Sequence, residues 1–298
     1  MQLKYIWFPL GAVSIWAGNT VISKMSAGVI APEDISFYRW VLAAALMSPF
    51  LARQTWAARA QIRPHLGKIL VLALLGMVLF QSLAYFAAAT SSATSMGIIA
   101  SLMPLLTLLL SIQLLSEPPT VGTLAGGLLS LFGLAVLIGR GHPLALFDNG
   151  VVVGDLLMLL ATIAYGLYGV MLRRWALPLR TWQLLYMQVL MAVVLLFPGF
   201  VLGHHSPVTA DNLPILLYAG IAASIISQFL WMRGVAHLGA SRCAIFVNLM
   251  PIFTVIIAVA ALDEELHGYH AAGGVITLAG VIMAQALKQR LNIRAKAG

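Results

Sequence analysis

The sequence predicts an all-α integral membrane protein whose ten transmembrane helices form two inverted five-helix repeats. Three observations carry this prediction: the composition, the length of the apolar runs and an internal repeat. Hydrophobic residues make up 61% of the 298 residues and charged residues only 9%, whereas a soluble domain carries about 25% charged residues. The apolar runs approach the ~20 residues that a helix needs to cross a bilayer, which favours helices over a β-barrel.

The second half of the chain repeats the first. An offset of 147 residues aligns positions 81–135 with 228–282 without a gap, and 16 of the 55 aligned positions are identical. The identities include the run Leu-Met-Pro, which stands at 102–104 and again at 249–251. An odd number of spans per repeat turns the second repeat upside down in the bilayer. Inverted repeats with a site between them are typical of alternating access.

Ten spans are expected, and several of the links between them are very short. The spans cover roughly residues 5–24, 34–52, 67–89, 93–115, 120–139, 152–173, 182–203, 212–236, 241–262 and 268–288. We therefore predict a first five-helix repeat over 1–140, a linker over 141–151, a second repeat over 152–290 and a basic cytoplasmic tail over 291–298.

The basic residues are distributed unevenly between the two sides of the predicted membrane. With the N-terminus placed in the cytoplasm, 14 of the 17 Lys and Arg residues fall in inside segments. This asymmetry predicts that both termini are cytoplasmic. The net charge of +8 then reflects membrane orientation, so we expect no nucleic-acid partner. The first span is expected to act as an uncleaved insertion signal.

The fifth and tenth spans are rich in glycine, with the pairs Gly126-Gly127 and Gly273-Gly274 at matching positions. Small residues allow helix backbones to approach closely. We expect these spans to be packing elements away from the substrate, and the protein to be a monomer or a weak dimer through them. The single cysteine, Cys243, excludes an internal disulfide and is expected to be a small packing residue.

Polar side chains near the middle of a span usually face the bundle interior or a cavity, because exposing them to lipid is costly. Here they recur with aromatic residues at i,i+3 or i,i+4, so that each pair shares one helix face. We predict a substrate cavity between the repeats lined by Trp16, Asn19, Gln81, Tyr85, Ser101, Tyr165, Tyr168, Gln228, Trp231 and Asn248. The competing interpretation is structural: an amide in a span often only bonds a neighbouring helix, for about 0.6 kcal/mol on average.

Pro104 and Pro251 stand inside the fourth and ninth spans at matching positions. A proline removes one helix hydrogen bond and can kink the helix, so we predict hinges there, with static kinks as the alternative. Near mid-span the sequence has no Asp or Glu, which argues against a buried proton relay. Arg39 lies within the second span and is expected to snorkel outwards, with Asp155 or a substrate carboxylate as its alternative partners.

Motifs for enzyme chemistry are missing from the sequence. A glycine-rich phosphate loop, a serine nucleophile elbow and an HExxH helix are all absent, so we expect no catalytic residues and no cofactor. The pair His204-His205, and His267 and His270 with the neighbouring acidic residues, lack a closed four-ligand spacing. We expect these groups to be solvated and predict no metal site.

Several of these features resemble the drug/metabolite transporter superfamily, EamA type: two five-span repeats, a proline in the fourth and ninth spans, and Glu117 and Glu264 soon after each. The run Trp-Ala-Gly-Asn at 16–19 and Ser-Leu-Met-Pro at 101–104 look like YddG-type exporters of aromatic amino acids and methyl viologen. The resemblance implies an inner-membrane exporter with a cavity lined by spans 1, 3, 4, 6, 8 and 9. Nucleotide-sugar and triose-phosphate carriers share this fold, but they need basic residues that the predicted mid-span cavity lacks.

We therefore expect a secondary transporter in a bacterial inner membrane, with the lipid bilayer and small molecules as its partners. It would export aromatic or broadly neutral amino acids, and cationic drugs resembling methyl viologen as a second class, by alternating access. The aromatic rings would stack on the substrate, and the amides would bind its α-amino and carboxylate groups. Two alternatives stay open: a multidrug or metabolite exporter with no amino-acid role, and a membrane scaffold that transports nothing.

Overall fold

A computed structural model of the protein describes residues 2–25, 30–88, 90–91, 96, 99–139, 152–203, 205, 207–262 and 267–291. Within these residues the regular structure is helical, apart from one isolated antiparallel bridge between Thr120 and Arg290. Side chains at residues 2–3, 20–25, 32, 85, 88 and 258–262 also lie outside the description.

The helices follow the apolar runs of the sequence. They are η1 (Gln2–Tyr5), α1 (Trp7–Met25), α2 (Pro32–Ala57), α3 (Arg59–Ile62), η2 (Arg63–His65), α4 (Leu66–Ala73), η3 (Leu74–Leu79), α5 (Phe80–Ala88), α7 (Met103–Leu115), α8 (Val121–Ile138), α9 (Val153–Trp175), α10 (Thr181–Leu202), α11 (Leu213–Leu217), η5 (Tyr218–Ile226), α12 (Ser227–Leu238), α13 (Ala240–Ala244), η6 (Ile245–Leu249), α14 (Met250–Leu262) and α15 (Gly268–Ala286).

Eight helical runs in the described residues are long and apolar enough to cross a membrane. They are Glu33–Ala57, Arg59–Ala84, Val121–Ile138, Val153–Trp175, Thr181–Leu202, Leu213–Leu238, Ala240–Ile257 and Gly268–Ala286, with a shorter apolar helix at Ile99–Leu115. The 19-residue α1 stands beside them. An all-helical membrane protein is thereby confirmed, whereas the count of ten spans and the inversion of the repeats stay predictions.

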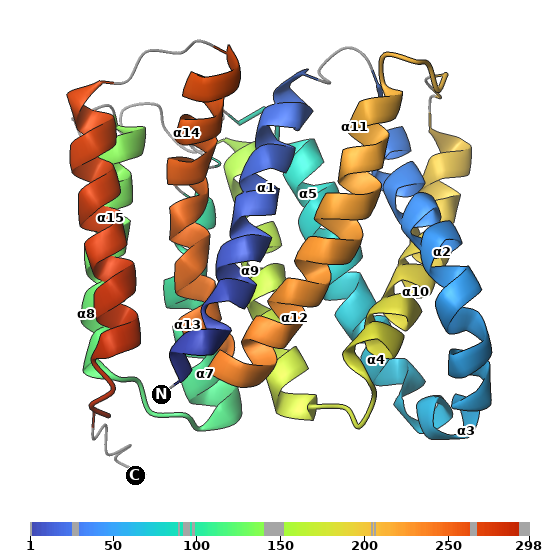
Figure 1. The fold of residues 1–298 in the computed structure, drawn as a ribbon, viewed down its shortest axis with the longest axis horizontal. Helices are drawn as coiled ribbons and strands as arrows, with labels where there is room; N and C mark the ends of the chain where they lie inside the picture. Colours follow the sequence, from blue (N-terminus) through green and yellow to red (C-terminus); the bar gives the residue numbers. More distant parts are fainter. Residues whose placement is uncertain are drawn as a thin grey trace.

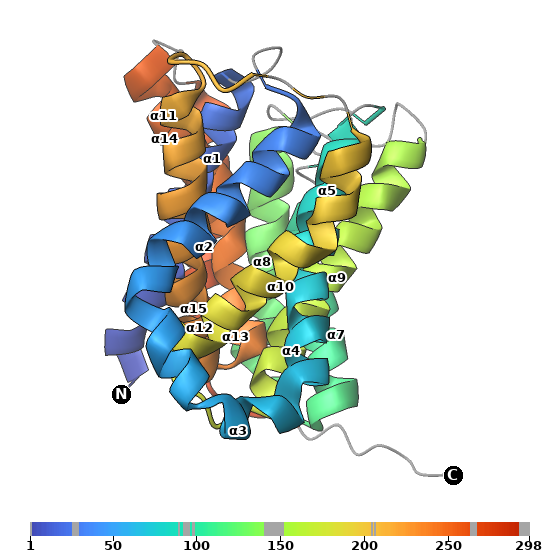
Figure 2. The ribbon, with the colours of Figure 1, turned by 90° about the vertical axis from the view of Figure 1, so that its right-hand side faces the viewer.

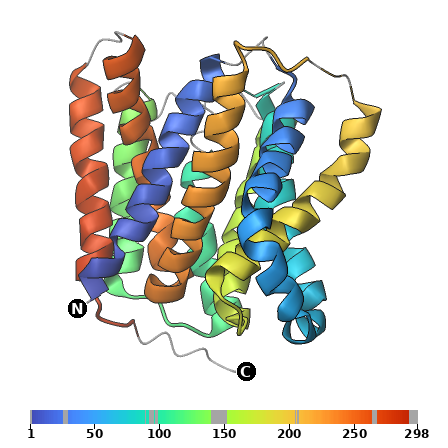
Figure 3. The same ribbon diagram turned by 45° about the vertical axis from the view of Figure 1, so that its right-hand side comes forward.

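The helices form a bundle in which segments distant in sequence lie side by side (Figures 1 and 2). α1 packs against α12 and α14, α2 packs against α10, and α9 contacts both α5 and α7. α8 and α15 form a pair at one edge of the bundle, which Figure 3 shows at the left. Helix η1 and the C-terminal end of α15 lie at the same end of the bundle (Figure 1).

Glycines hold α8 and α15 together. A Cβ added at Gly273 would lie 2.7 Å from the carbonyl oxygen of Gly133, and one added at Gly126 would lie 2.5 Å from the carbonyl oxygen of Gly280. The backbones therefore meet without intervening side chains, as small residues permit in membrane helices. The glycine stripes expected in the fifth and tenth spans thus contact each other within one chain.

Two long helical runs change their winding at positions related by the 147-residue offset. The π-helical segment η3 covers Leu74–Leu79, and the π-helical segment η5 covers Tyr218–Ile226, which includes the matching positions 221–226. Gln81 and Gln228 follow soon after these segments. π-Helical turns inside α-helices are frequent at functional sites, because they re-aim the side chains that follow.

The two predicted hinge prolines each stand second in an α-helical segment that continues directly from a preceding helical turn. Pro104 is in the first turn of α7, where its missing N–H would have no helical partner, and Pro251 is the second residue of α14. A tighter turn precedes each: the Leu102 N–H donates to the Ile99 carbonyl at 3.1 Å, and η6 is a 3-10 helix. Proline is tolerated well near the start of an α-helical segment, and hinge movement at these two positions stays a prediction.

Candidate functional site

An aromatic cluster lies where α1, α5, α9 and α12 meet. Tyr165 is at its centre, with ring centroids 5.7 Å from Trp16, 4.7 Å from Phe80 and 5.7 Å from Trp231. Trp16 and Trp231 also contact each other at 5.1 Å, and Tyr168 lies 5.4 Å from Tyr165. We call these five residues the aromatic cluster. Trp16 and Phe80 belong to the first half of the sequence, and the other three belong to the second half.

The local sequence explains why these rings converge. Tyr165 and Tyr168 are three residues apart on α9 and so share one helix face. Trp231 stands three residues after Gln228 on α12, which places both on the face of α12 that meets α9. Side chains this large are commonly buried at such a crossing because each buries 150–250 Å². Tyr168 and Trp231 are 0% and 2% exposed.

A polar group lies at the edge of the cluster. The Tyr165 hydroxyl donates to Oε1 of Gln228 at 3.4 Å, and Gln228 is buried. One helical turn before Gln228 is Ser224, whose hydroxyl donates to the Ala219 carbonyl at 2.7 Å, a spacing typical of the π-helical segment η5. Ser224 and Gln228 thus present two polar groups beside the rings.

Arg39 is placed differently from the sequence expectation. Its side chain is 3% exposed, and its Nε donates to the Ser224 hydroxyl at 2.7 Å. The guanidinium also lies 5.3 Å from the Trp40 ring centroid. Arg39 therefore does not snorkel outwards; a fixed positive charge stands one turn of helix from Gln228. Asp155, its alternative partner in the sequence interpretation, instead accepts a bond from Ser91.

The remaining predicted residues whose side chains the structure describes divide into two groups. Asn19 and Gln81 are half-buried on α1 and α5, the helices that contribute Trp16 and Phe80 to the cluster. Ser101 is buried in the turn before α7, while Asn248 is buried in η6 and its Nδ2 donates to the Ser130 hydroxyl on α8 at 2.8 Å. The observed hydrogen bond of Asn248 therefore joins η6 to a packing helix, as the structural interpretation of an amide in a span predicts. The side chain of Tyr85 lies outside the described residues.

Sequence reasoning missed Phe80 and placed Arg39 wrongly. Phe80 precedes Gln81, but an isolated phenylalanine in an apolar run carries no polar signal. Arg39 was noticed, but its burial depends on Ser224, which is 185 positions away in the sequence. The signal that could have found Arg39 is its distance from the span ends, since a basic residue well inside a span usually faces the bundle interior.

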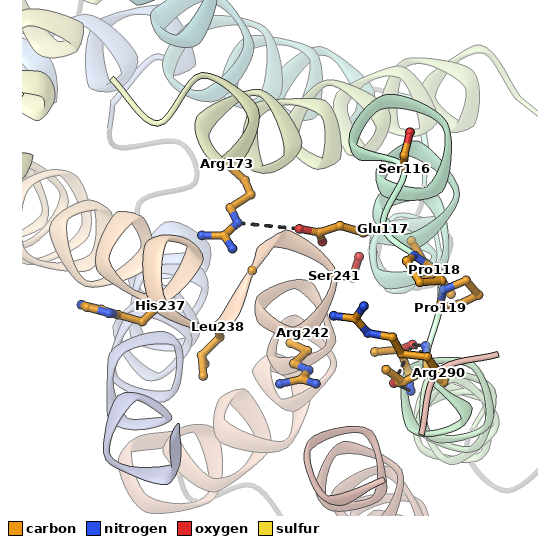
Figure 4. A pocket seen from close by; sticks show the side chains of 14 residues that line it. Ser116, Glu117, Pro118, Pro119, Arg173, His237, Leu238, Ser241, Arg242 and Arg290 are labelled. Carbon is orange, nitrogen blue, oxygen red and sulfur yellow. Dashed lines mark hydrogen bonds and ion pairs between the residues drawn. The ribbon is translucent and has the colours of Figure 1, made fainter. Parts of the chain in front are cut away.

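A pocket of about 390 Å³ opens at the end of the bundle that carries η1 and the end of α15. It is bordered by the α7–α8 connection, the last turn of α9, the α12–α13 connection and the segment after α15. Figure 4 shows Arg173 and Arg290 facing each other across Glu117 and Ser241. Arg173 Nε lies 3.8 Å from a Glu117 carboxylate oxygen, and both side chains are nearly half exposed.

Metal ligation finds no support in the part of the chain that the structure covers. No group of three or more His, Cys, Asp and Glu side chains is placed there to hold an ion. His267 and His270 contact each other, and the His267 N–H donates to His270 Nδ1 at 3.1 Å, which caps the start of α15. His204 and the acidic residues 263–265 lie outside the described residues.

The comparison with known proteins identifies a family. Residues 3–139 and 152–285 match the model of the EamA-like transporter family. The uncharacterized transporter YyaM of Bacillus subtilis is 27% identical over 295 residues, covering 95% of this chain and 94% of the relative. An uncharacterized transporter of Archaeoglobus fulgidus is 28% identical and covers 91% of this chain and 94% of its own length.

Two further relatives extend the comparison. The protein PecM of Dickeya dadantii is 26% identical over 228 residues, which is 74% of each chain. A solved crystal structure superposes with a TM-score of 0.79 at 21% identity, covering 98% of this chain and 100% of the other. At that identity the superposition shows the fold alone.

Proposed function

Because the chain belongs to the EamA-like transporter family, we propose that it is a secondary transporter that exports aromatic or broadly neutral amino acids by alternating access. The observation that carries the proposal is the aromatic cluster with Gln228 at its edge. Rings from α1 and α5 meet rings from α9 and α12 there, so a substrate held among them would contact both halves of the chain.

The chemistry of the cluster suits an amino acid with an apolar side chain. The rings offer stacking surfaces, and aromatic pairs gain about 0.5–1.5 kcal/mol beyond their area burial. Gln228 offers an amide that both donates and accepts, and Arg39 offers a positive charge one turn away. The predicted lining residues Asn19, Gln81, Tyr85 and Ser101 complete the proposed cavity, whereas Asn248 bonds Ser130 on α8.

The mechanism follows from the changes of winding in the helices. The π-helical segments η3 and η5 and the helix starts at Pro104 and Pro251 are places where a helix bends at small cost. We propose that the two halves rock about the cluster and that these segments absorb the bending. Ten spans, the inversion of the repeats and cytoplasmic termini in a bacterial inner membrane belong to this proposal, and reporter fusions at each end of the chain test the topology.

A second candidate is the export of cationic drugs. The observation that favours it is again the set of rings, because Trp and Tyr faces attract cations with about 0.5–2 kcal/mol. The family match supports transport without enzyme chemistry, so a scaffold role is the weaker alternative.

Counterflow into proteoliposomes separates these functions. Purified protein is reconstituted and supplied with a panel of labelled amino acids and labelled methyl viologen. Accumulation of aromatic or neutral amino acids supports the proposal, and accumulation of methyl viologen alone supports the drug exporter. If no compound accumulates above the level in empty liposomes, the transport proposal fails.

A further inference from the structure

The pocket at the end of the bundle carries an excess of positive charge. Its charged lining residues are Arg173, Arg242 and Arg290 against Glu117. Arg290 is held in place by the backbone, since Leu291 N–H donates to the Pro119 carbonyl at 2.8 Å. Figure 4 shows the guanidinium groups of Arg173 and Arg290 on either side of Glu117 and Ser241.

The pocket reaches from the end of the bundle towards the aromatic cluster. Its lining includes Leu108 of α7, which stands eight residues before Ser116, about 12 Å along the helix at 1.5 Å per residue. Thr107, the residue before Leu108, packs against Gly166 of α9. In the sequence, Gly166 stands between Tyr165 and Tyr168 of the aromatic cluster. On α12 the pocket is lined by Leu238, which stands seven residues after Trp231 and therefore on the same helix face.

The one acidic group in the lining is weakly bound. Arg173 and Glu117 touch at 3.8 Å, with side chains 41% and 48% exposed, and exposed pairs of this kind contribute little. A carboxylate entering the pocket therefore replaces Glu117 on Arg173 at low cost. Arg173 is oriented for this exchange, because its Nη1 donates to the Ala236 carbonyl at 3.0 Å.

We propose that this pocket is the entry vestibule of the transport route and that its arginines select substrates that bear a carboxylate. This proposal rests on the proposed transport function and adds a substrate preference to it. Arg39, fixed on Ser224 beside the cluster, supplies a charge of the same sign further along the route. Cations without a carboxylate, such as methyl viologen, meet repulsion at both places and are poor substrates.

The charge of the pocket is tested without any substrate. Ser241, which lines the pocket, is replaced by cysteine in Ser241→Cys. The rates at which this cysteine reacts with an anionic and with a cationic methanethiosulfonate reagent are measured. Each rate is divided by the rate of the same reagent with a free thiol, and the two normalised rates are compared as a ratio. The unsubstituted protein, whose Cys243 is buried, is the blank. The normalised ratio should favour the anionic reagent, and Arg173→Gln or Arg290→Gln should each lower it about fivefold, as expected for one charge about 8 Å away in water.

Arg174→Gln is the matched control, because Arg174 is exposed on the same turn of α9 and does not line the pocket. It should leave the normalised ratio unchanged. A ratio that favours the cationic reagent, or one that the three arginine substitutions change equally, would overturn the assignment of a positive vestibule.

The selection step is tested by counterflow of L-phenylalanine against L-phenylalaninamide, which lacks the carboxylate. The amide should be transported far more slowly. Arg173→Gln and Arg290→Gln should each raise KM for L-phenylalanine about twofold at unchanged maximal rate, as expected for one carboxylate about 8 Å from the lost charge in water, whereas Arg174→Gln should not. If L-phenylalanine and L-phenylalaninamide are transported at equal rates and the arginine substitutions leave KM unchanged, the vestibule proposal is wrong and the transport function stands. If neither these two nor any other compound of the panel moves, the transport function fails and the vestibule falls with it.

Discussion

The hydroxyl of Tyr165 on α9 lies 3.4 Å from Oε1 of Gln228 on α12, and both side chains are buried. This contact joins the polar edge of the aromatic cluster to its central ring. In the proposed cycle a substrate amino or carboxylate group takes the place of one partner. The Tyr165 hydroxyl and the Gln228 amide must therefore both be present and able to exchange partners.

Tyr165→Phe removes only the hydroxyl. Because a hydrogen bond of this type contributes about 1 kcal/mol, we expect transport of L-phenylalanine to fall about fivefold while the abundance in the membrane stays the same. Tyr186→Phe is the control: its hydroxyl is bonded at 2.8 Å to Ser48 of α2, which is not part of the cluster, so transport should be preserved. Equal effects of the two substitutions on transport would remove Tyr165 from the binding site.

Trp16→Leu tests the stacking role of the rings. Trp16 contacts Tyr165 and Trp231, and loss of a ring contact of this kind costs about 1 kcal/mol. Transport of L-phenylalanine should decrease about fivefold relative to transport of L-alanine, measured by counterflow on the same liposomes. Trp56→Leu, at an exposed ring outside the cluster, should leave the ratio unchanged; a constant ratio in Trp16→Leu would argue that Trp16 only packs.

Gly273→Ala and Gly274→Ala form a matched pair on α15. A Cβ at Gly273 would lie 2.7 Å from the Gly133 carbonyl oxygen, while nothing lies within 4 Å of one at Gly274. Overpacking costs about 1–3 kcal/mol, so Gly273→Ala should lower the Tm in detergent by about 5 °C and Gly274→Ala should not. A neutral Gly273→Ala would show that α8 and α15 are not in close contact.

Pro251→Ala tests bending at the start of α14. Alanine restores an N–H and favours a continuous helix from η6 into α14, so we expect slower transport at unchanged abundance. Pro198→Ala is the control, because Pro198 is an exposed proline inside α10 and does not belong to the cluster. If Pro251→Ala transports at the native rate, that proline is a static feature.

Much of the fold could be predicted from the sequence, because hydrophobic runs fix where a helix crosses the bilayer. The spans around α2, α8, α9, α10 and α15 were expected within a few residues of their observed bounds. The winding changes could not be predicted. A π-helical turn at Leu74–Leu79 arises from packing against neighbouring helices, and an apolar run carries no local signal for it.

The site was predicted in part. Spacing on one helix face was sufficient to pair Tyr165 with Tyr168 on α9 and Gln228 with Trp231 on α12, because the geometry of a single helix relates the two residues of each pair. The same reasoning could not predict the partner of Asn248. Whether its amide faces the cluster or bonds Ser130 on α8 depends on how separate helices are rotated relative to each other. The burial of Arg39 depends on Ser224 for the same reason.

The central claim is that the aromatic cluster with Gln228 binds the transported substrate. The most direct measurement is counterflow of labelled L-phenylalanine by the native protein and by Gln228→Ala, at matched amounts in liposomes, with Gln54→Ala at an exposed glutamine as the control. The account predicts accumulation by the native protein and the control, and a strongly reduced rate in Gln228→Ala at equal abundance. Native rates in Gln228→Ala, or a loss of abundance as its only effect, would contradict it.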